Sequence, residues 1–332
     1  MPPKRPNDAV LESVDAPKAK KARTDAANAA PKASTTKGTD ARAANGQPMN
    51  KLLPMNFSIP KKDPATTRIA AWNVAGMKAC LSKGFKIYTP KEDADIWVLT
   101  ETKMNAPSLE PALTKNYPYR YWSISTKPGY AGTCILSKVK PLHVSRSLPS
   151  HLHSDPDSTK GRIITLEFDN YYLVGTYVVN AGEKLKSMEA KKEWMKAFHL
   201  YLAELDAKKP VVWAGDVNCA PTAKDLAKGN DKWNKRPGYT EVECTAFKKL
   251  LAEVKLVDVW RDMNPNLEHY TFWDYRTFGR TKGDGWRLDM FVLSERIRDW
   301  VKSCEIRDDI YGASDHCPIV MDICIPVPDS TA

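Results

Sequence analysis

Eight short apolar runs recur along the chain from residue 68 onward. Each run is rich in Val, Ile, Tyr or Trp and is bounded by Gly, Pro, Asn or Lys, which is the pattern of β-strands separated by turns. The runs occupy residues 68–74, 95–101, 132–137, 162–168, 171–180, 210–218, 287–294 and 317–325. We therefore expect these segments to form strands.

Two segments between these runs have the spacing of amphipathic helices. Residues 245–254 show this spacing, and so do residues 187–208. In the longer segment, one helical stripe consists of Met188, Met195, Phe198, Leu202 and Leu205. Many strands with few intervening helices indicate a layered α/β domain, in which sheet packs on sheet and helices lie outside.

Residues 1–62 differ from the rest of the 332-residue chain in composition and charge. They are rich in Ala, Pro, Lys, Asp and Thr, and they hold 12 Lys/Arg against 5 Asp/Glu. The remaining residues carry only three of the ten excess positive charges. A segment with so few large apolar side chains cannot offset its ordering entropy. The prediction is a disordered basic tail over 1–62 and a catalytic domain over 63–332.

Two basic clusters in this tail are similar to nuclear-import signals. They are "KRP" at 4–6 and "KAKKAR" at 18–23. They predict a nuclear protein and leave a mitochondrial pool open, while the alternative is a solubilising tail that no receptor reads. A basic tail also suits nucleic acid or another anionic surface as a partner.

The cysteines and the hydropathy exclude two classes of protein. Seven cysteines form no C-x-x-C pair, and most lie inside apolar runs, where a free thiol packs as a small hydrophobe. This usage predicts a reducing compartment and no disulfide framework. No apolar stretch approaches the roughly 20 residues of a membrane span, and no secretory signal opens the chain, so we expect no membrane association.

Polar side chains follow several of the predicted strands. They are Asn73, Glu101, Asn180, Asp216 and Asn218, joined by Asp289 and the Asp315–His316 pair. Ligand sites in α/β sheets favour strand ends, and carboxylates with amides suit Mg²⁺ and a phosphate. Zinc is disfavoured because the single histidine has no Cys or second His at ligand spacing. Each residue alone also fits a turn or a helix cap, so the combination carries the prediction.

The motifs that surround these residues resemble those of one enzyme family. "WNVAG", "LTETK", "TYVVNAG", "WAGDVNCAPT", "YTFWDYR", "GWRLDMFVLS" and "ASDHCPIVM" occur in the order and approximate spacing of the exonuclease III family of apurinic/apyrimidinic (AP) endonucleases. The resemblance covers residues 66–326. It implies a DNase-I-like four-layered α/β sandwich, in which two packed mixed sheets are flanked by helices.

Two of these motifs distinguish the AP endonucleases from the wider superfamily. "ETK", "GDxN" and "SDH" are shared with inositol-phosphate phosphatases and sphingomyelinases, whereas "FWDY" and "GWRLD" are more specific. The implied activity is Mg²⁺-dependent hydrolysis of DNA 5′ to an abasic site in base-excision repair, with 3′-5′ exonuclease and 3′-end-cleaning activity in addition. The alternatives are a phosphatase or phosphodiesterase on a small phosphorylated substrate, and a catalytically weak DNA-binding relative.

The resemblance also implies roles for individual residues. Glu101 is the principal ligand of Mg²⁺, for which Mn²⁺ substitutes, and the implied metal site further includes Asn73, Asp216, Asn218, Asp315 and His316. Asp216 orients or deprotonates the attacking water, with Asn218 beside it. Tyr177 and Asn180 contact the scissile phosphate. His316 donates to a phosphate oxygen while Asp289 holds its other ring nitrogen.

Further residues are implied in substrate recognition. Phe272, Trp286 and Leu288 resemble the apolar pocket for a flipped-out sugar without a base, and their alternative is ordinary core. DNA contacts are expected from Arg162, Tyr130 and Arg276. The implied partners are double-stranded DNA with abasic sites and base-excision repair proteins, and the protein is expected to be a monomer.

Three positions depart from the family pattern. Ala75 stands where relatives usually carry Asp or Asn near the metal, which predicts a weaker hold on the ion. Val179 replaces a common proline. Glu183 occupies a position where some animal relatives place an Arg that enters the DNA, which predicts a looser hold on product.

Overall fold

The computed structural model describes residues 41–326, and its strands form two six-stranded sheets. The first sheet has the order β11 (Val301–Ile306), β12 (Ile319–Ile323), β1 (Thr67–Asn73), β2 (Ile96–Thr100), β4 (Thr133–Ser137) and β3 (Tyr119–Ser123). The second has the order β5 (His143–Ser145), β6 (Ile163–Glu167), β7 (Tyr172–Tyr177), β8 (Val211–Asp216), β10 (Asp289–Ser294) and β9 (Leu256–Asp258).

Both sheets are mixed. In each, one central pair is parallel, β1 with β2 and β7 with β8, and all other pairs are antiparallel. The eight predicted apolar runs all contain strands of these sheets. These runs are almost continuously apolar because the central strands are buried on both faces.

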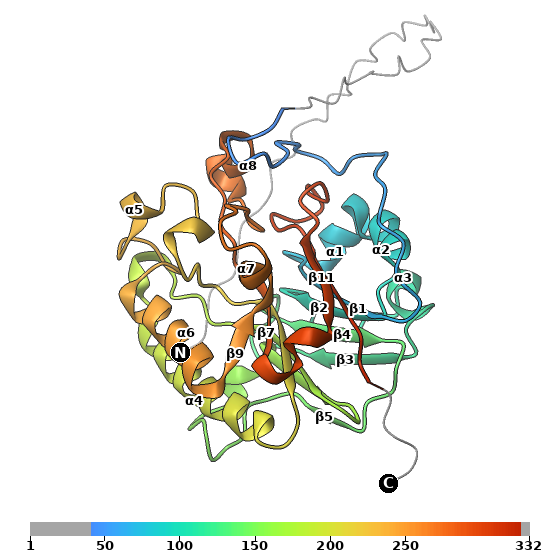
Figure 1. Ribbon diagram of the computed structural model, residues 1–332, viewed down its shortest axis with the longest axis vertical. Helices are drawn as coiled ribbons and strands as arrows, with labels where there is room; N and C mark the ends of the chain where they lie inside the picture. Colours follow the sequence, from blue (N-terminus) through green and yellow to red (C-terminus); the bar gives the residue numbers. More distant parts are fainter. Residues whose placement is uncertain (1–40, 327–332) are drawn as a thin grey trace, which may run out of the picture. The chain divides into compact units, whose positions relative to one another are not determined.

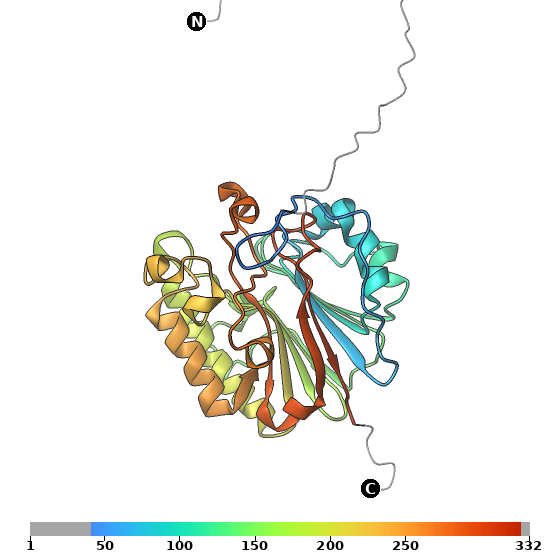
Figure 2. The same ribbon diagram turned by 45° about the horizontal axis from the view of Figure 1, so that its top comes forward.

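Helices cover the outer face of each sheet (Figures 1 and 2). The α-helices are α1 (Met77–Cys80), α2 (Lys86–Glu92), α3 (Pro111–Thr114), α4 (Met188–Asp206), α5 (Gly229–Lys232), α6 (Glu241–Val254), α7 (Val259–Met263) and α8 (Gly279–Lys282). A π-helical turn, η1 (Leu81–Phe85), joins α1 to α2. The 3₁₀ turns are η2 (Pro156–Thr159), η3 (Glu183–Leu185), η4 (Ala223–Asp225), η5 (Tyr275–Thr277) and η6 (Glu295–Trp300).

Three apolar cores hold the layers together. The central core joins the facing sheets through side chains such as Ile69 and Val98 from one sheet and Val212 and Phe291 from the other. A second core packs α4 and α6 on the second sheet, and a third packs α1 to α3 on the first. The order helix, sheet, sheet, helix confirms the predicted four-layered α/β sandwich (Figure 2).

The folded part begins before residue 63, which corrects one sequence prediction. Gln47 is buried, and its side-chain amide exchanges two hydrogen bonds with the main chain of Tyr270, at 2.8 and 3.0 Å. Phe57 packs against Tyr88, with ring centroids 6.1 Å apart. Disorder is therefore wrong for residues 41–62, because these contacts lie outside what local composition records. The import-like clusters at 4–6 and 18–23 lie outside the described residues.

The thiols and the helices agree with the exclusions made from the sequence. All seven cysteines are free, and only Cys324 is partly exposed. Within residues 41–326, no helix has the length and apolar character needed to cross a bilayer.

Candidate active site

The ends of strands from both sheets meet at one hydrogen-bonded amide. Asn73, the last residue of β1, is fully buried and points its side chain toward the second sheet. Its Nδ2 donates to Glu101 Oε1 at 3.0 Å and to Asp216 Oδ2 at 2.9 Å. Glu101 directly follows β2, and Asp216 ends β8. The parallel pairing of β1 with β2 explains the first contact, and the packing of the two sheets explains the second.

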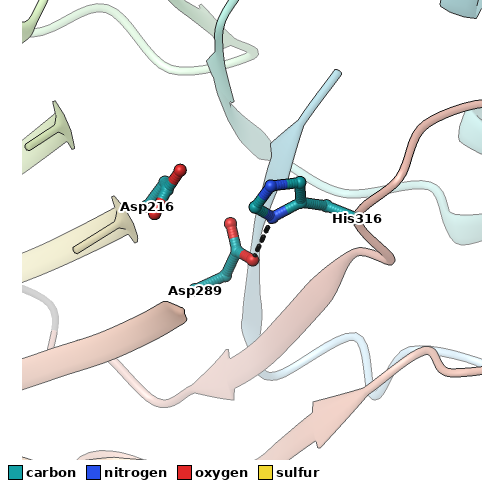
Figure 3. Close-up of side chains that lie close together, drawn as sticks. All are labelled: Asp216, Asp289 and His316. Atoms are coloured by element: carbon teal, nitrogen blue, oxygen red, sulfur yellow. Dashed lines mark hydrogen bonds and ion pairs between the residues drawn. The ribbon is translucent and has the colours of Figure 1, made fainter. Parts of the chain in front are cut away.

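Asp216, Asp289 and His316 form a buried cluster beside this amide (Figure 3). The register of β10 against β8 places Asp289 directly opposite Asp216. One ligand-type atom of each of the three side chains lies within 4.8 Å of the others. Asp289 Oδ2 is 2.7 Å from His316 Nδ1 and accepts a second bond from Thr271 Oγ1 at 2.7 Å. Its other oxygen, Oδ1, is buried and has no partner.

The cluster shifts the pKa values of two of its members. Burial, together with the charge of Asp289, raises the pKa of Asp216 to about 7. Burial alone would lower the pKa of His316, but its ion pair with Asp289 overcomes this and raises the pKa to about 10. At neutral pH His316 is therefore an imidazolium, and Asp216 lies near its midpoint. This pairing of a proton acceptor with a cation suits acid–base work on an anion.

Asn218 is held in a left-handed backbone conformation, with φ at 50°. Its main-chain N–H donates to Asp216 Oδ1 at 2.8 Å, and its side-chain Nδ2 donates to the carbonyl oxygen of Val178 at 2.9 Å. Asn180 Nδ2 in turn donates to Asn218 Oδ1 at 2.8 Å. Asn180 is exposed, so this series of amides runs from the buried carboxylate to the surface.

Glu101 and Asp315 are the remaining carboxylates of the predicted set. Burial opposes ionisation of Glu101, but Lys103, 2.8 Å away, and the bond from Asn73 hold its pKa below the ordinary value. For Asp315, burial raises the pKa. The charges of Glu101 and His316 both act on Asp315, which places it beside the cluster.

Three further residues connect the site to its rim. Tyr177 ends β7 opposite Asp216, and burial with the charges of Glu101 and Asp216 raises the pKa of its hydroxyl. The guanidinium of Arg162 lies 5.1 Å from the Tyr177 ring centroid and donates to the hydroxyl of Tyr130 at 2.8 Å. Tyr130 is 44% exposed, so it is accessible to a ligand on the surface.

Partly exposed aromatic side chains lie next to His316. The ring centroid of Phe272 is 4.7 Å from that of His316, and Phe272 forms β-bridges with both His316 and Trp286. Phe272 and Trp286 are partly buried, whereas Leu288 is buried. Arg276 is exposed, and its guanidinium pairs with Asp274 rather than with another predicted residue.

Sequence reasoning missed Thr271, which fixes Asp289 from the side opposite His316. Its Oγ1 donates to Asp289 Oδ2 and accepts from the main-chain N–H groups of Leu288 and Asp289, at 3.0 and 3.1 Å. Thr271 stands inside the quoted "YTFWDYR" motif, but a threonine in an apolar run has no local signal for this role.

Comparison with known proteins decides the family. A model of the endonuclease/exonuclease/phosphatase family matches residues 70–316. The chain belongs to this family. The match includes every strand end that supplies the site, and within the family the resemblance to AP endonucleases is confirmed by individual relatives.

Two curated relatives and one solved structure illustrate this similarity. The DNA-(apurinic or apyrimidinic site) endonuclease of Dictyostelium discoideum is 41% identical over 269 residues, which cover 80% of this chain and 72% of that protein. An exodeoxyribonuclease of Bacillus subtilis is 37% identical over 255 residues, 76% of this chain and 97% of the relative. The crystal structure of an AP endonuclease from Leishmania major aligns with a TM-score of 0.70 and 27% identity, covering 84% of this chain and 94% of that one.

Proposed function

We propose that this protein hydrolyses the DNA phosphodiester 5′ to an abasic site and leaves a 3′ hydroxyl. The relatives named as AP endonucleases support this activity. The observation that carries it is the meeting of Asp216, Asp289 and His316, with Phe272 packed against the histidine. A proton acceptor, a fixed cation and an apolar wall lie together, as cleavage beside a sugar without a base requires.

The donor set fits a hard divalent cation, and we assign Mg²⁺, with Mn²⁺ as a substitute. Glu101 would be the principal ligand, because its pKa is lowered and one of its oxygens faces the shared amide of Asn73. Asp315 and the oxygens of Asp216 and Asn218 complete the candidate ligands. The unpartnered oxygen Asp289 Oδ1 shows that the buried cluster holds acceptor capacity that protein donors leave unused. When bound, the cation supplies positive charge that stabilises the transition state of phosphoryl transfer.

Asp216 would act on the attacking water. Its buried carboxylate has a pKa of about 7, which suits a general base near neutral pH. The amide of Asn73 and the main-chain N–H of Asn218 hold the two carboxylate oxygens in fixed directions. Such fixed orientation shortens the search for the in-line geometry.

His316 would donate a hydrogen bond to a nonbridging phosphate oxygen. Its Nδ1 is engaged with Asp289, which leaves Nε2 for the substrate. Of the two roles expected for His316, this ion pair favours the donor over the metal ligand, because an imidazolium has no lone pair to offer. Tyr177 and Asn180 would add further donors at the same phosphate. Fixed donors of this kind are each worth about 3–4 kcal/mol in transition-state stabilisation.

Substrate selection would rest on the aromatic side chains beside the histidine. Phe272, Trp286 and Leu288 would receive the extruded sugar, since an abasic nucleotide has lost the stacking and pairing that resist extrusion. Arg162, Tyr130 and Arg276 would contact the flanking DNA backbone. The Bacillus relative named as an exodeoxyribonuclease supports a second activity, 3′-5′ removal of nucleotides and 3′-end cleaning at the same centre.

An assay on duplex DNA with one tetrahydrofuran site tests the proposal. Incision 5′ to the tetrahydrofuran in Mg²⁺, abolished by EDTA and restored by excess Mg²⁺, is the expected outcome. Hydrolysis of inositol phosphates without DNA incision would instead indicate a small-molecule phosphatase. Binding without cleavage at every Mg²⁺ and Mn²⁺ concentration would indicate a non-catalytic DNA-binding protein. The cellular setting, namely the nucleus and base-excision repair partners, follows the same proposal, as does the monomeric state.

A further inference from the structure

A fully buried ion pair lies directly behind the site. Lys191 of α4 and Glu243 of α6 both have no exposed side-chain surface, and Lys191 Nζ lies 2.5 Å from Glu243 Oε1. The same ammonium donates to the main-chain carbonyl oxygen of Asn218 at 2.7 Å. Lysine and glutamate are almost never fully buried unless they are paired, so this pair has a specific cause.

Glu243 has partners for both of its oxygens. The main-chain N–H of Gly238 lies 2.9 and 3.0 Å from the two oxygens, and the Thr240 hydroxyl donates at 2.8 Å. Glu243 also lies in the first turn of α6, where the helix dipole favours a negative charge. The carboxylate is thus held rigidly, and it presents one oxygen to Lys191.

Stability alone does not account for such a pair. Removing two charges from water is costly, and apolar replacements of a buried ion pair are often as stable as the pair itself. Leucine or methionine on α4 and α6 would fill the same volume in the adjoining core. What an apolar side chain cannot do is donate to the carbonyl oxygen of Asn218.

The main chain of Asn218 is tied at both ends. Its N–H donates to the Asp216 carboxylate, and its C=O accepts from Lys191. With φ at 50°, Asn218 is in a conformation that non-glycine residues seldom adopt, so surrounding bonds must maintain it. The bonds therefore run without a break from Glu243 through Lys191 and Asn218 to Asp216.

The neighbouring loop closes against the same carbonyl. A Cβ on Gly238 would lie 3.2 Å from the Asn218 carbonyl oxygen, and φ of Gly238 is +86°. Two residues after Asn218, the N–H of Ala220 donates to the carbonyl oxygen of Gly238 at 2.8 Å. The residue that anchors Glu243 thus also limits the space around Asn218.

We infer that Lys191 and Glu243 are positioning residues for the cleavage reaction. They act through the main chain of Asn218, which sets the direction of the Asp216 carboxylate, and their full burial keeps them away from the substrate. This role rests on the proposed function of Asp216. It predicts that loss of the pair lowers turnover and leaves DNA binding intact.

The double variant Lys191→Met/Glu243→Gln tests this role without leaving a charge unpaired. Glutamine keeps an acceptor for Gly238, so the start of α6 is preserved. We expect single-turnover cleavage at saturating Mg²⁺ to fall on the order of 10- to 100-fold, as for misplacement of a reacting group. The Kd for abasic duplex should stay within about threefold, because no DNA contact is removed. Lys191→Arg, which keeps a cation able to reach both oxygens, should restore most of the rate.

A second buried pair provides the matched control. Arg68 and Asp322 exchange two hydrogen bonds of 2.7 Å, near the end of β1 opposite Asn73. Arg68→Met/Asp322→Asn therefore removes comparable buried charge far from the site. We expect a lower melting temperature and an unchanged cleavage rate of the folded protein. An equal loss of rate in the control and test pairs would assign Lys191 and Glu243 to stability only.

A spectroscopic measurement separates this role from the proposed function. With selective ¹⁵N-asparagine labelling, the Asn218 amide should exchange slowly in the wild type and lose protection in the double variant. A wild type that cleaves no DNA would overturn the proposed function, while the Asn218 exchange would still decide whether the pair holds this residue. Unchanged protection, or cleavage by the double variant within about threefold of the wild type, would overturn the positioning role.

Discussion

Asn73 and Asp216 join the two sheets of the sandwich at the active site. The side-chain amide of Asn73, at the end of β1, donates to Asp216 Oδ2 at 2.9 Å, at the end of β8. The same amide donates to Glu101, the leading candidate for a metal ligand. Packing of the sheets therefore sets the distance between the carboxylate assigned to water and the carboxylate assigned to the cation.

Asp216→Asn should separate chemistry from binding. The amide fills the same volume but accepts no proton, so single-turnover cleavage should fall by about three orders of magnitude or more. Binding of abasic duplex should persist because the phosphate donors remain. Glu101→Ala should differ, because it should raise the Mg²⁺ concentration needed for half-maximal rate. Cleavage by Asp216→Asn within about tenfold of the wild type would contradict the assignment of the base.

The pH profile should reflect the two shifted groups. Asp216 acts as base only when ionised, so the rate should rise with pH through its pKa of about 7. His316 donates only when protonated, so the rate should fall as pH rises through its pKa of about 10. A bound cation favours the ionised carboxylate, so more Mg²⁺ should shift the acid limb to lower pH. Profiles at two Mg²⁺ concentrations check both limbs, and an acid limb that ignores Mg²⁺ would place Asp216 away from the ion.

Truncation should distinguish residues 1–40 from residues 41–62. Deleting 1–40 should leave the melting temperature and the cleavage rate unchanged. Deleting 1–62 also removes the Gln47–Tyr270 bonds and the packing of Phe57, and it should destabilise the domain by about 3 kcal/mol. Urea unfolding of the two truncated proteins measures the difference. Equal stability would show that the packed segment adds nothing to the domain.

The sequence predicted the central strands because their burial appears in their composition. Runs such as 96–100 and 211–216 are buried at every position and are apolar almost throughout. The edge strand β11 was missed because most of its side chains are partly exposed and several are polar. The segment 41–62 was missed for another reason, since its folding depends on Tyr270 and Tyr88, which are distant in sequence.

The site was predicted as far as residue type and strand position could carry it. Asn73, Asp216 and Asp289 end or begin strands, and strand pairing brought them together. Lys191 could not be predicted, because a lysine among charged helix residues is typical of a solvent-facing side. Its burial follows only from the packing of α4 on α6, which places Glu243 opposite.

Phe272→Ala should impair incision at abasic sites more than it impairs stability. Its ring packs on His316 and is partly exposed, so truncation opens the proposed sugar pocket. We expect kcat/KM on the tetrahydrofuran duplex to fall about tenfold or more. Phe278→Ala is the control, because that ring is 67% exposed and should be dispensable. Equal effects of the two changes would indicate that Phe272 does not wall the pocket.

Ala75 departs from the family pattern at a point close to Glu101. Its N–H donates to Asn73 Oδ1 at 3.0 Å, and the next residue, Gly76, donates to the main-chain oxygen of Glu101 at 2.8 Å. Ala75 has φ of 49°, a conformation that Asp and Asn tolerate better than most residues. An aspartate therefore fits this backbone and would add a carboxylate beside the proposed metal ligand.

Ala75→Asp should consequently lower the Mg²⁺ requirement. Mg²⁺ keeps several waters in most enzyme sites, so the wild type should remain active although it lacks this carboxylate. The variant should reach half-maximal rate at about two- to tenfold lower Mg²⁺, because one more anion attracts the ion. Ala75→Asn is the matched control, since it adds similar volume without charge and should shift the curve less. Titration of the three proteins on one abasic duplex decides the point, and superimposable curves would mean that position 75 does not reach the surroundings of the ion.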